Sequence, residues 1–202
     1  MTWSLEPSGT YTVASLWRFI DETILPKTPV GAWQWNNLVP GKVNILAWCV
    51  CYRRLPTRVN LKNIGIRSLT SCPLCNIVEE SESHLLTKCQ FSQEVWRSVQ
   101  KWWYMLPLLF GSLNEMLQCR NLAPGSDNLH QIQEAVVLIY IWVIWKFRND
   151  RIHSNTIKSF KTLANEVQVH WFLMGEFGIL GDVPNYSRRA FGVSLFHRVD
   201  IC

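Results

Sequence analysis

Three cysteines and one histidine lie close together in the middle of the chain, in the spacing Cys72-x2-Cys75-x8-His84-x4-Cys89. Two cysteines separated by two residues form a tight turn that directs both thiolates at one metal ion, and a later His and Cys close a tetrahedron from a second segment. Three sulfur ligands and one nitrogen ligand suit Zn²⁺. Four protein ligands leave no open position, so we predict one structural zinc ion that takes no part in hydrolysis.

The other interpretation of this cluster is a set of free thiols beside an unrelated histidine. The chain has seven cysteines, an odd number, and its first residues, MTWSLEPSGT, have neither the basic nor the apolar segment of a secretory signal. We therefore expect a nuclear or cytoplasmic protein that is not secreted. Clustered cysteines in a reducing compartment are more often metal ligands than disulfides, which favours zinc. Cys49, Cys51 and Cys119 lie in apolar sequence and are expected in the core.

The residues between the ligands predict the local shape of the segment. Glu79, Glu80 and Glu82 are expected to face solvent and to keep the loop soluble. The step of five residues from His84 to Cys89 does not put both side chains on one face of an α-helix. We therefore expect the following helix to start irregularly, or the chain to bend at Cys89.

A block of basic residues precedes the cluster. No acidic residue occurs between Glu22 and Glu79, and the formal net charge of the chain is +5. A polyanion such as nucleic acid would explain the block, and a solvated face is the alternative. The expected phosphate contacts are Lys42, Arg53, Arg54, Arg58, Lys62 and Arg67. The partner would be RNA or DNA, bound with weak sequence preference.

The spacing of apolar residues predicts helices through most of the chain. The expected spans are 11–25, 43–54 with the helix entered just after Pro40, 57–65, 91–103, about 130–150 and about 159–174, with Thr57 and Ser92 as N-caps and Gly65 as a left-handed stop. No run of alternating residues is long enough to propose a sheet. We predict an all-α fold, a small helical domain around the zinc site followed by one or two long C-terminal helices. The eleven tryptophans are expected mainly in the core, with base stacking as the alternative.

The longest apolar run extends from Ala135 to Trp145. A bilayer span needs about 20 apolar residues, and Lys146 and Arg148 close this run at roughly half that length. We interpret the run as a buried helix or as a surface that binds a partner, including a second copy of the chain.

The sequence offers no catalytic motif. It contains no G-x-S-x-G, no P-loop and no Gly-rich dinucleotide turn. No pair of carboxylates lies in strand-like apolar sequence of the kind that holds two metal ions for phosphoryl transfer. Asp150 and Glu166 are isolated acids, and the histidines outside the cluster are scattered. We expect a protein that is not an enzyme.

Several motifs occur in an order that resembles a known family. They are W-x3-P-S-G-T-Y-T-V, W-x-W-N-x-L-V-P-G-K-V-x2-L-A-W, R-R-L-P-T-R-x-N-L, the C-P-L-C…H-L-L-x2-C cluster, and E-V-W. This order resembles the zinc-binding domain that follows the reverse transcriptase in plant LINE-type, non-LTR retrotransposon polyproteins. The resemblance covers Trp3 to Trp103, and WVIWKFRNDRIH resembles the helix that follows the domain in many of these proteins.

The resemblance implies a ligand set and a role. By it, Cys72, Cys75, His84 and Cys89 are the zinc ligands, and the domain helps to engage template RNA or target DNA during target-primed reverse transcription. Polyproteins of the family carry an endonuclease and a polymerase with a Y-x-D-D type motif, and neither is present in this sequence. No polymerase activity therefore carries over.

We predict four parts, a zinc-binding domain at 1–105 with its zinc site at 72–89, a linker at 106–128, a C-terminal helical segment at 129–175 and a loosely ordered tail at 176–202. The function we expect is a zinc-stabilised nucleic-acid-binding module, a fragment of a retrotransposon reverse transcriptase polyprotein. The alternatives are a protein-interaction or dimerisation module that uses residues 135–145, and a decayed retroelement fragment without a function.

Overall fold

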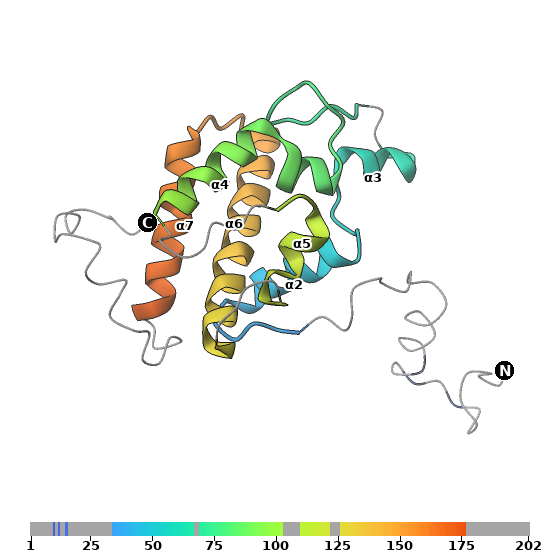
Figure 1. The fold of residues 1–202 in the computed structure, drawn as a ribbon. Helices are drawn as coiled ribbons and strands as arrows, with labels where there is room; N and C mark the ends of the chain where they lie inside the picture. Colours follow the sequence, from blue (N-terminus) through green and yellow to red (C-terminus); the bar gives the residue numbers. More distant parts are fainter. Residues whose placement is uncertain are drawn as a thin grey trace.

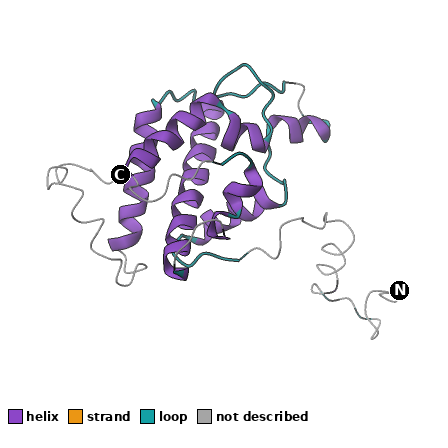
Figure 2. Cartoon of the chain, viewed as in Figure 1, coloured by secondary structure: helices purple, strands orange, loops and turns teal. Residues whose placement is uncertain are grey.

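The computed structural model describes residues 10, 12, 15, 34–66, 69–102, 110–121 and 126–176. These residues form helices joined by loops (Figure 1, Figure 2), with no strand among them and an isolated bridge between Ser71 and Glu79. The predicted all-α class is therefore confirmed. In chain order the helices are α2 (Gly41–Cys51), α3 (Arg58–Asn63), the π-helix η2 (His84–Lys88), α4 (Gln90–Trp102), α5 (Leu113–Leu117), the 3₁₀-helix η3 (Cys119–Asn121), α6 (Asp127–His153) and α7 (Phe160–Glu176).

Helix α6 is the central element of the fold. Its 27 residues correspond to a length of about 40 Å, and it stands between α4 and α7 on one side and α2 and α5 on the other (Figure 1). Nearly all its side chains from Ala135 to Phe147 are buried. Because other helices cover α6 from several sides, its sequence lacks a broad polar stripe. No helix in the described part of the chain is long and apolar enough to cross a membrane.

The apolar run from Ala135 to Trp145 therefore takes the first of its two predicted roles, that of a buried helix. Trp142 is the one residue of the run that is not buried. Self-association through residues 135–145 stays a prediction, and the surface that the run offers for it is limited to the surroundings of Trp142.

Helix α2 starts at Gly41, directly after Pro40, as predicted. Proline fits this position because it has no N–H that the helix would leave unpaired. The apolar side chains that α2 buries follow the spacing of one helical face and pack in the common core; they are Val43, Leu46, Ala47, Val50 and Cys51.

A buried polar network attaches the start of α2 to α6. The N–H of Asn36 donates to Asn44 Oδ1 at 2.9 Å, and Asn44 Nδ2 donates to the carbonyl of Asn36 at 2.9 Å. Asn36 Nδ2 in turn donates to Glu134 Oε2 at 2.8 Å. Asn44, the polar residue within an otherwise apolar segment, thus has its hydrogen-bonding groups satisfied inside the core.

Two of the three predicted helix boundaries around the cluster are confirmed. The side chain of Thr57 accepts a hydrogen bond from the N–H of Asn60 at 3.3 Å and caps α3. Gly65 has a φ of 77°, the left-handed conformation expected after the end of this helix.

The third boundary, an N-cap at Ser92, is wrong. Helix α4 already starts at Gln90, because the N–H of Gln93 donates to the carbonyl of Cys89 at 2.9 Å. Ser92 is therefore a buried residue inside the first turn of α4.

The remaining predicted elements have different outcomes. Helix α6 extends beyond the predicted span 130–150 at both ends, and α7 extends beyond the predicted span 159–174 at its C-terminal end. Helices α5 and η3 form within residues 106–128, and the division of the chain at this predicted linker stays a prediction. The predicted helix at 11–25 and the predicted tail at 176–202 lie almost entirely outside the described residues.

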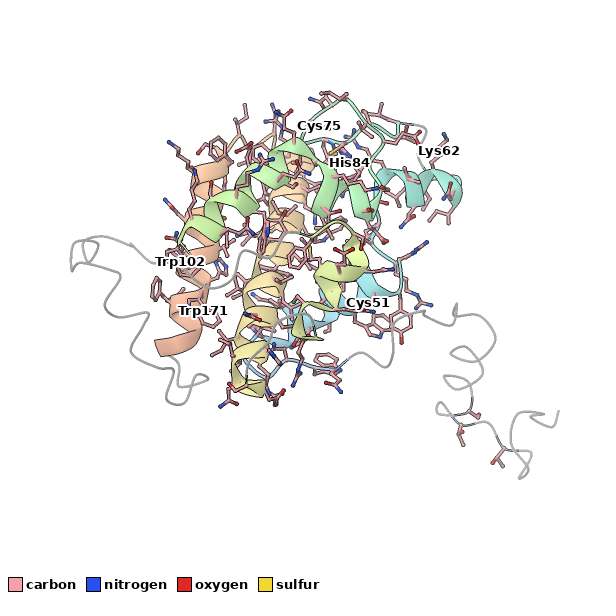
Figure 3. All side chains as sticks on the ribbon, viewed as in Figure 1. Cys51, Lys62, Cys75, His84, Trp102 and Trp171 are labelled. Atoms are coloured by element: carbon pink, nitrogen blue, oxygen red, sulfur yellow. The ribbon has the colours of Figure 1, made fainter. Side chains whose placement is uncertain are left out.

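Aromatic pairs connect α4 to the two C-terminal helices. The ring of Phe91 stacks on Phe147 of α6 at a centroid distance of 5.5 Å, and Trp96 meets the edge of Tyr140 at 5.0 Å. Trp102 meets the edge of the Phe172 ring of α7. Trp171 of the same helix is buried, and Figure 3 labels it together with Trp102. Tryptophan therefore contributes to the core, as predicted, and side chains from residues before and after 105 share that core.

Candidate metal centre

The four predicted ligands converge in the segment of residues 69–89, which we call the finger. The ligand atoms of Cys72, Cys75, His84 and Cys89 all lie within 4.8 Å of one another. Cys75 Sγ is 3.3 Å from His84 Nε2, and Figure 3 shows the two side chains together near the start of α4. In a tetrahedral zinc site with bonds of about 2.0–2.3 Å, ligand atoms are about 3.6–3.8 Å apart. The four atoms thus surround a position that could bind one metal ion.

The first half of the site is a turn held by its own backbone. The N–H of Asn76 donates to the carbonyl of Cys72 at 2.8 Å, and the N–H of Cys72 donates to the carbonyl of Val78 at 2.7 Å. Asn76 has a φ of 58°, a left-handed conformation that asparagine tolerates better than most residues. The backbone of Leu74 and Cys75 hydrogen-bonds the sulfur of Cys72. This turn therefore presents two sulfur atoms to one point.

The second half of the site is the π-helix η2. The N–H of Cys89 donates to the carbonyl of His84 at 2.6 Å, a bond across five residues that an α-helix does not make. Cys89 itself has extended backbone angles, so the chain bends there before α4 begins. The expected irregular start and bend are confirmed. The wider turn brings together two side chains that an ordinary α-helix would direct apart.

The two buried thiols of the site differ in their acidity. A hydrogen bond between Cys72 and Cys89 raises the pKa of Cys72 and lowers the pKa of Cys89 to about 5, against the opposing effect of burial. Hydrogen bonds from the backbone of Ser92 and Phe91 lower the pKa of Cys89 further. These groups belong to the first turn of α4, where the helix dipole favours negative charge. The site thus favours a thiolate, the form of cysteine that binds metals.

The three cysteines outside the finger in the described part of the chain have the opposite character. Burial raises the pKa of Cys49, and it raises the pKa of Cys51 and Cys119 to about 12. All three pack in or against the hydrophobic core, as predicted. A neutral thiol in apolar surroundings behaves as a small hydrophobic side chain.

Glu80 does not face solvent, which corrects the sequence prediction. It is 0% exposed and pairs with Arg148 of α6, which is 4% exposed. Arg148 Nε lies 2.6 Å from Glu80 Oε1, and a second guanidinium nitrogen lies 2.6 Å from Oε2. Glu80 Oε2 also accepts the N–H of Arg58 at 2.8 Å, and Arg148 donates to the carbonyl of Pro56 at 3.2 Å. Such a two-pronged pair is among the strongest side-chain contacts in proteins.

Glu82 is buried as well, so the same prediction is wrong there. One of its carboxylate oxygens accepts the N–H of Leu55 at 2.9 Å and the side-chain amide of Asn60 at 3.3 Å. Burial raises the pKa of Glu82 to about 7. Only Glu79 is exposed, as predicted. Two of the three acids therefore fasten the finger to the rest of the fold.

Sequence reasoning missed the Glu80–Arg148 pair. The two residues are separated by 68 positions. No local pattern distinguishes either one from an ordinary surface charge. The available signal was the motif W-K-F-R-N-D, in which an arginine lies within a strongly apolar helix. A charged residue in such a position is usually paired when it is buried.

Four of the predicted phosphate contacts are exposed side chains, namely Lys42, Arg53, Arg54 and Lys62. Lys62 projects from α3 (Figure 3), with its Nζ 4.0 Å from Glu79 Oε1. An exposed pair at this distance leaves the lysine accessible to other anions.

Arg58 and Arg67 differ from these four. Arg58 is half-buried, and one guanidinium nitrogen donates to the carbonyl of Ser71 at 2.6 Å, directly before the first cysteine of the cluster. Arg58 therefore helps to hold the finger in place. Arg67 lies outside the described residues.

The comparisons with known proteins agree with this geometry. Residues 11–96 match the family described as zinc-binding in reverse transcriptase. No curated protein and no solved structure matches the chain. The matched residues include the whole cluster and α2, whereas α6 and Arg148 lie beyond them.

Proposed function

We propose that residues 11–96, which match the family described as zinc-binding in reverse transcriptase, form a domain that binds one structural zinc ion and contacts nucleic acid. The observation that supports the metal is the convergence of Cys72, Cys75, His84 and Cys89 from two segments of the chain. Three sulfur atoms and one imidazole nitrogen fill a tetrahedron and leave no position for a water molecule or a substrate. The zinc ion would therefore stabilise the finger and would not catalyse a reaction.

The nucleic-acid role rests on the basic block and on the family. Four exposed cations lie on α2, on α3 and in the turn between them, in a part of the chain without acidic residues; they are Lys42, Arg53, Arg54 and Lys62. Positive side chains attract phosphates without reading the base sequence. In a LINE-type polyprotein of plants, the domain would help to engage template RNA or target DNA. Polymerisation would belong to other domains, since a zinc-binding domain is not itself catalytic.

This role is tested with labelled RNA and DNA oligonucleotides in a fluorescence anisotropy titration of the zinc-loaded chain over a range of salt concentrations. We expect binding at low salt, with log K falling linearly against log salt by about 0.7 for each phosphate contacted on a single strand. Removal of zinc by a chelator is expected to weaken binding, because the basic residues of α3 lie beside the finger. Absence of binding at low salt to every oligonucleotide would contradict the nucleic-acid role and leave the zinc site standing.

A further inference from the structure

A groove with a volume of about 760 Å³ lies between α2, the turn that follows it and the second half of α6. This volume is within the range of about 300–1,000 Å³ that is usual for ligand-binding pockets. None of the four cluster residues lines it, so the groove is separate from the candidate metal centre. Part of its wall comes from α6, which lies beyond the residues that match the family.

The groove is basic. Lys42 of α2, Arg54 in the following turn and Lys146 of α6 line it, and all three are exposed. None of them forms an ion pair within the described ranges. Asp150 is the only acid among the lining residues, while the charge of Arg148 is matched by Glu80. A concave surface with unpaired positive charge concentrates anionic ligands.

Aromatic rings complete the groove. Trp142 lines it, and Lys42 Nζ lies over the ring of Trp142, 5.2 Å from its centroid. Trp142 is half-buried and packs against the core, and the Lys42 side chain lies over its ring. A nucleobase offers a larger flat surface than a lysine amine does, and stacking on an aromatic side chain is the usual way in which proteins hold unpaired bases.

The spacing of the cations favours an extended ligand. Lys42 is nine residues before the end of α2, and Arg54 follows that end with its guanidinium over the rings of Trp48 and Tyr52. Lys42, Arg54 and Lys146 thus come from three different elements around one groove, an arrangement that suits a strand with several phosphates. We propose that this groove binds single-stranded RNA or DNA, with one base stacked on Trp142 and phosphates held by Lys42, Lys146 and Arg54. This inference rests on the proposed function and assigns nucleic-acid binding to the groove.

The test compares three double charge reversals by fluorescence anisotropy with a labelled oligothymidine of about 12 nucleotides, within the range of about 4–16 that single-strand-binding folds occupy. Lys42→Glu/Lys146→Glu changes the groove. Arg53→Glu/Lys62→Glu changes the basic block outside it. Lys101→Glu/Lys161→Glu changes two exposed lysines of α4 and α7 and has the same effect on net charge.

We expect the groove variant to bind at least tenfold more weakly than the other two and to lose about 1.4 from the salt slope, the value for two phosphate contacts. Equal losses of affinity in all three variants, or a larger loss of affinity in Arg53→Glu/Lys62→Glu, would overturn the assignment of binding to the groove. Absence of binding by the unaltered chain would overturn the proposed function together with the groove.

A second pair of variants tests the stacking without changing charge. Trp142→Leu keeps an apolar side chain and loses the ring, and we expect it to weaken binding by about 5- to 150-fold, the range for one stacked base. Trp142→Phe keeps a ring and should retain most of the affinity. Equal binding by the two variants, both with the helical content of the unaltered chain, would contradict the stacked base.

Discussion

The finger and helix α6 bury different kinds of atoms. In the finger, residues 69–89, the buried side chains include Cys72, His84 and Cys89 together with the carboxylates of Glu80 and Glu82. In α6 the buried side chains between Ala135 and Phe147 are apolar apart from the hydroxyl of Tyr140. Apolar side chains stabilise a fold when they leave water, whereas buried thiolates and carboxylates need partners. Metal removal should therefore affect the two regions unequally.

Chelation is expected to give the largest difference between the two regions. Structural zinc contributes about 10–16 kcal/mol to small zinc-dependent domains. Hydrogen exchange before and after addition of a chelator should show the amides of Cys72 to Cys89 losing most of their protection. The amides of Ala135 to Phe147 should keep theirs, because their packing does not involve the metal. A uniform loss over the chain would show that the two regions are not separable in this way.

Arg148→Met should have the next largest effect, because it leaves the carboxylate of Glu80 buried without its partner. Breaking a buried ion pair from one side usually costs about 3–5 kcal/mol. Urea denaturation followed by tryptophan fluorescence measures the loss. Arg151→Met, on the same helix and without an ion pair among the described residues, should change stability by less than about 0.5 kcal/mol.

A double variant separates the pair from other effects of the substitution. Glu80→Gln combined with Arg148→Met removes both charges, so it should recover much of the stability lost in Arg148→Met. If Arg148→Met and Arg151→Met are equally stable, the pair does not attach the finger to α6.

Tyr140→Phe should have a smaller effect on the same connection. The hydroxyl of Tyr140 lies 2.9 Å from the carbonyl of Leu86 and 3.0 Å from that of Ser92, one on each side of Cys89. The hydroxyl has one hydrogen, so its loss removes a hydrogen bond to one of these two buried carbonyl groups at a time, at about 1–3 kcal/mol. Thermal unfolding measures the change, and Tyr52→Phe, outside this contact, should melt like the unaltered chain.

Thr57→Ala should have the smallest effect, because it removes the cap of α3 and a single buried methyl group. An N-cap contributes about 1 kcal/mol. The finger would keep its ligands and its pair with Arg148, so zinc affinity measured by competition with a chelator should change little. A loss of zinc affinity as large as that in Arg148→Met would mean that α3, and not α6, positions the finger.

The sequence allowed the helical class and the cluster to be predicted, because both depend on patterns within a few residues. The spacing of apolar residues in α2 and α6 and the cap at Thr57 are examples of such local signals. The step from His84 to Cys89 predicted an irregularity without naming its form, since η2 depends on how the next helix packs.

The errors concern residues whose environment is set by distant parts of the chain. Glu80 and Glu82 were predicted to face solvent because their partners are far away in sequence. Glu80 pairs with Arg148, and Glu82 accepts from the backbone of Leu55. Ser92 has the side chain of an N-cap, but the bend at Cys89 starts α4 earlier. The role of Arg58 as a phosphate contact stays a prediction, and its guanidinium also donates to the backbone beside the cluster.

The most direct test of the account is the zinc content of the purified chain and of two matched variants. Cys75→Ser removes one cluster ligand, and Cys49→Ser changes a partly buried cysteine outside the cluster. Elemental analysis should find one zinc ion per chain in the unaltered protein and in Cys49→Ser, and a strongly reduced content in Cys75→Ser. Absence of zinc from the unaltered chain, or equal contents in the two variants, would contradict a zinc site at Cys72, Cys75, His84 and Cys89.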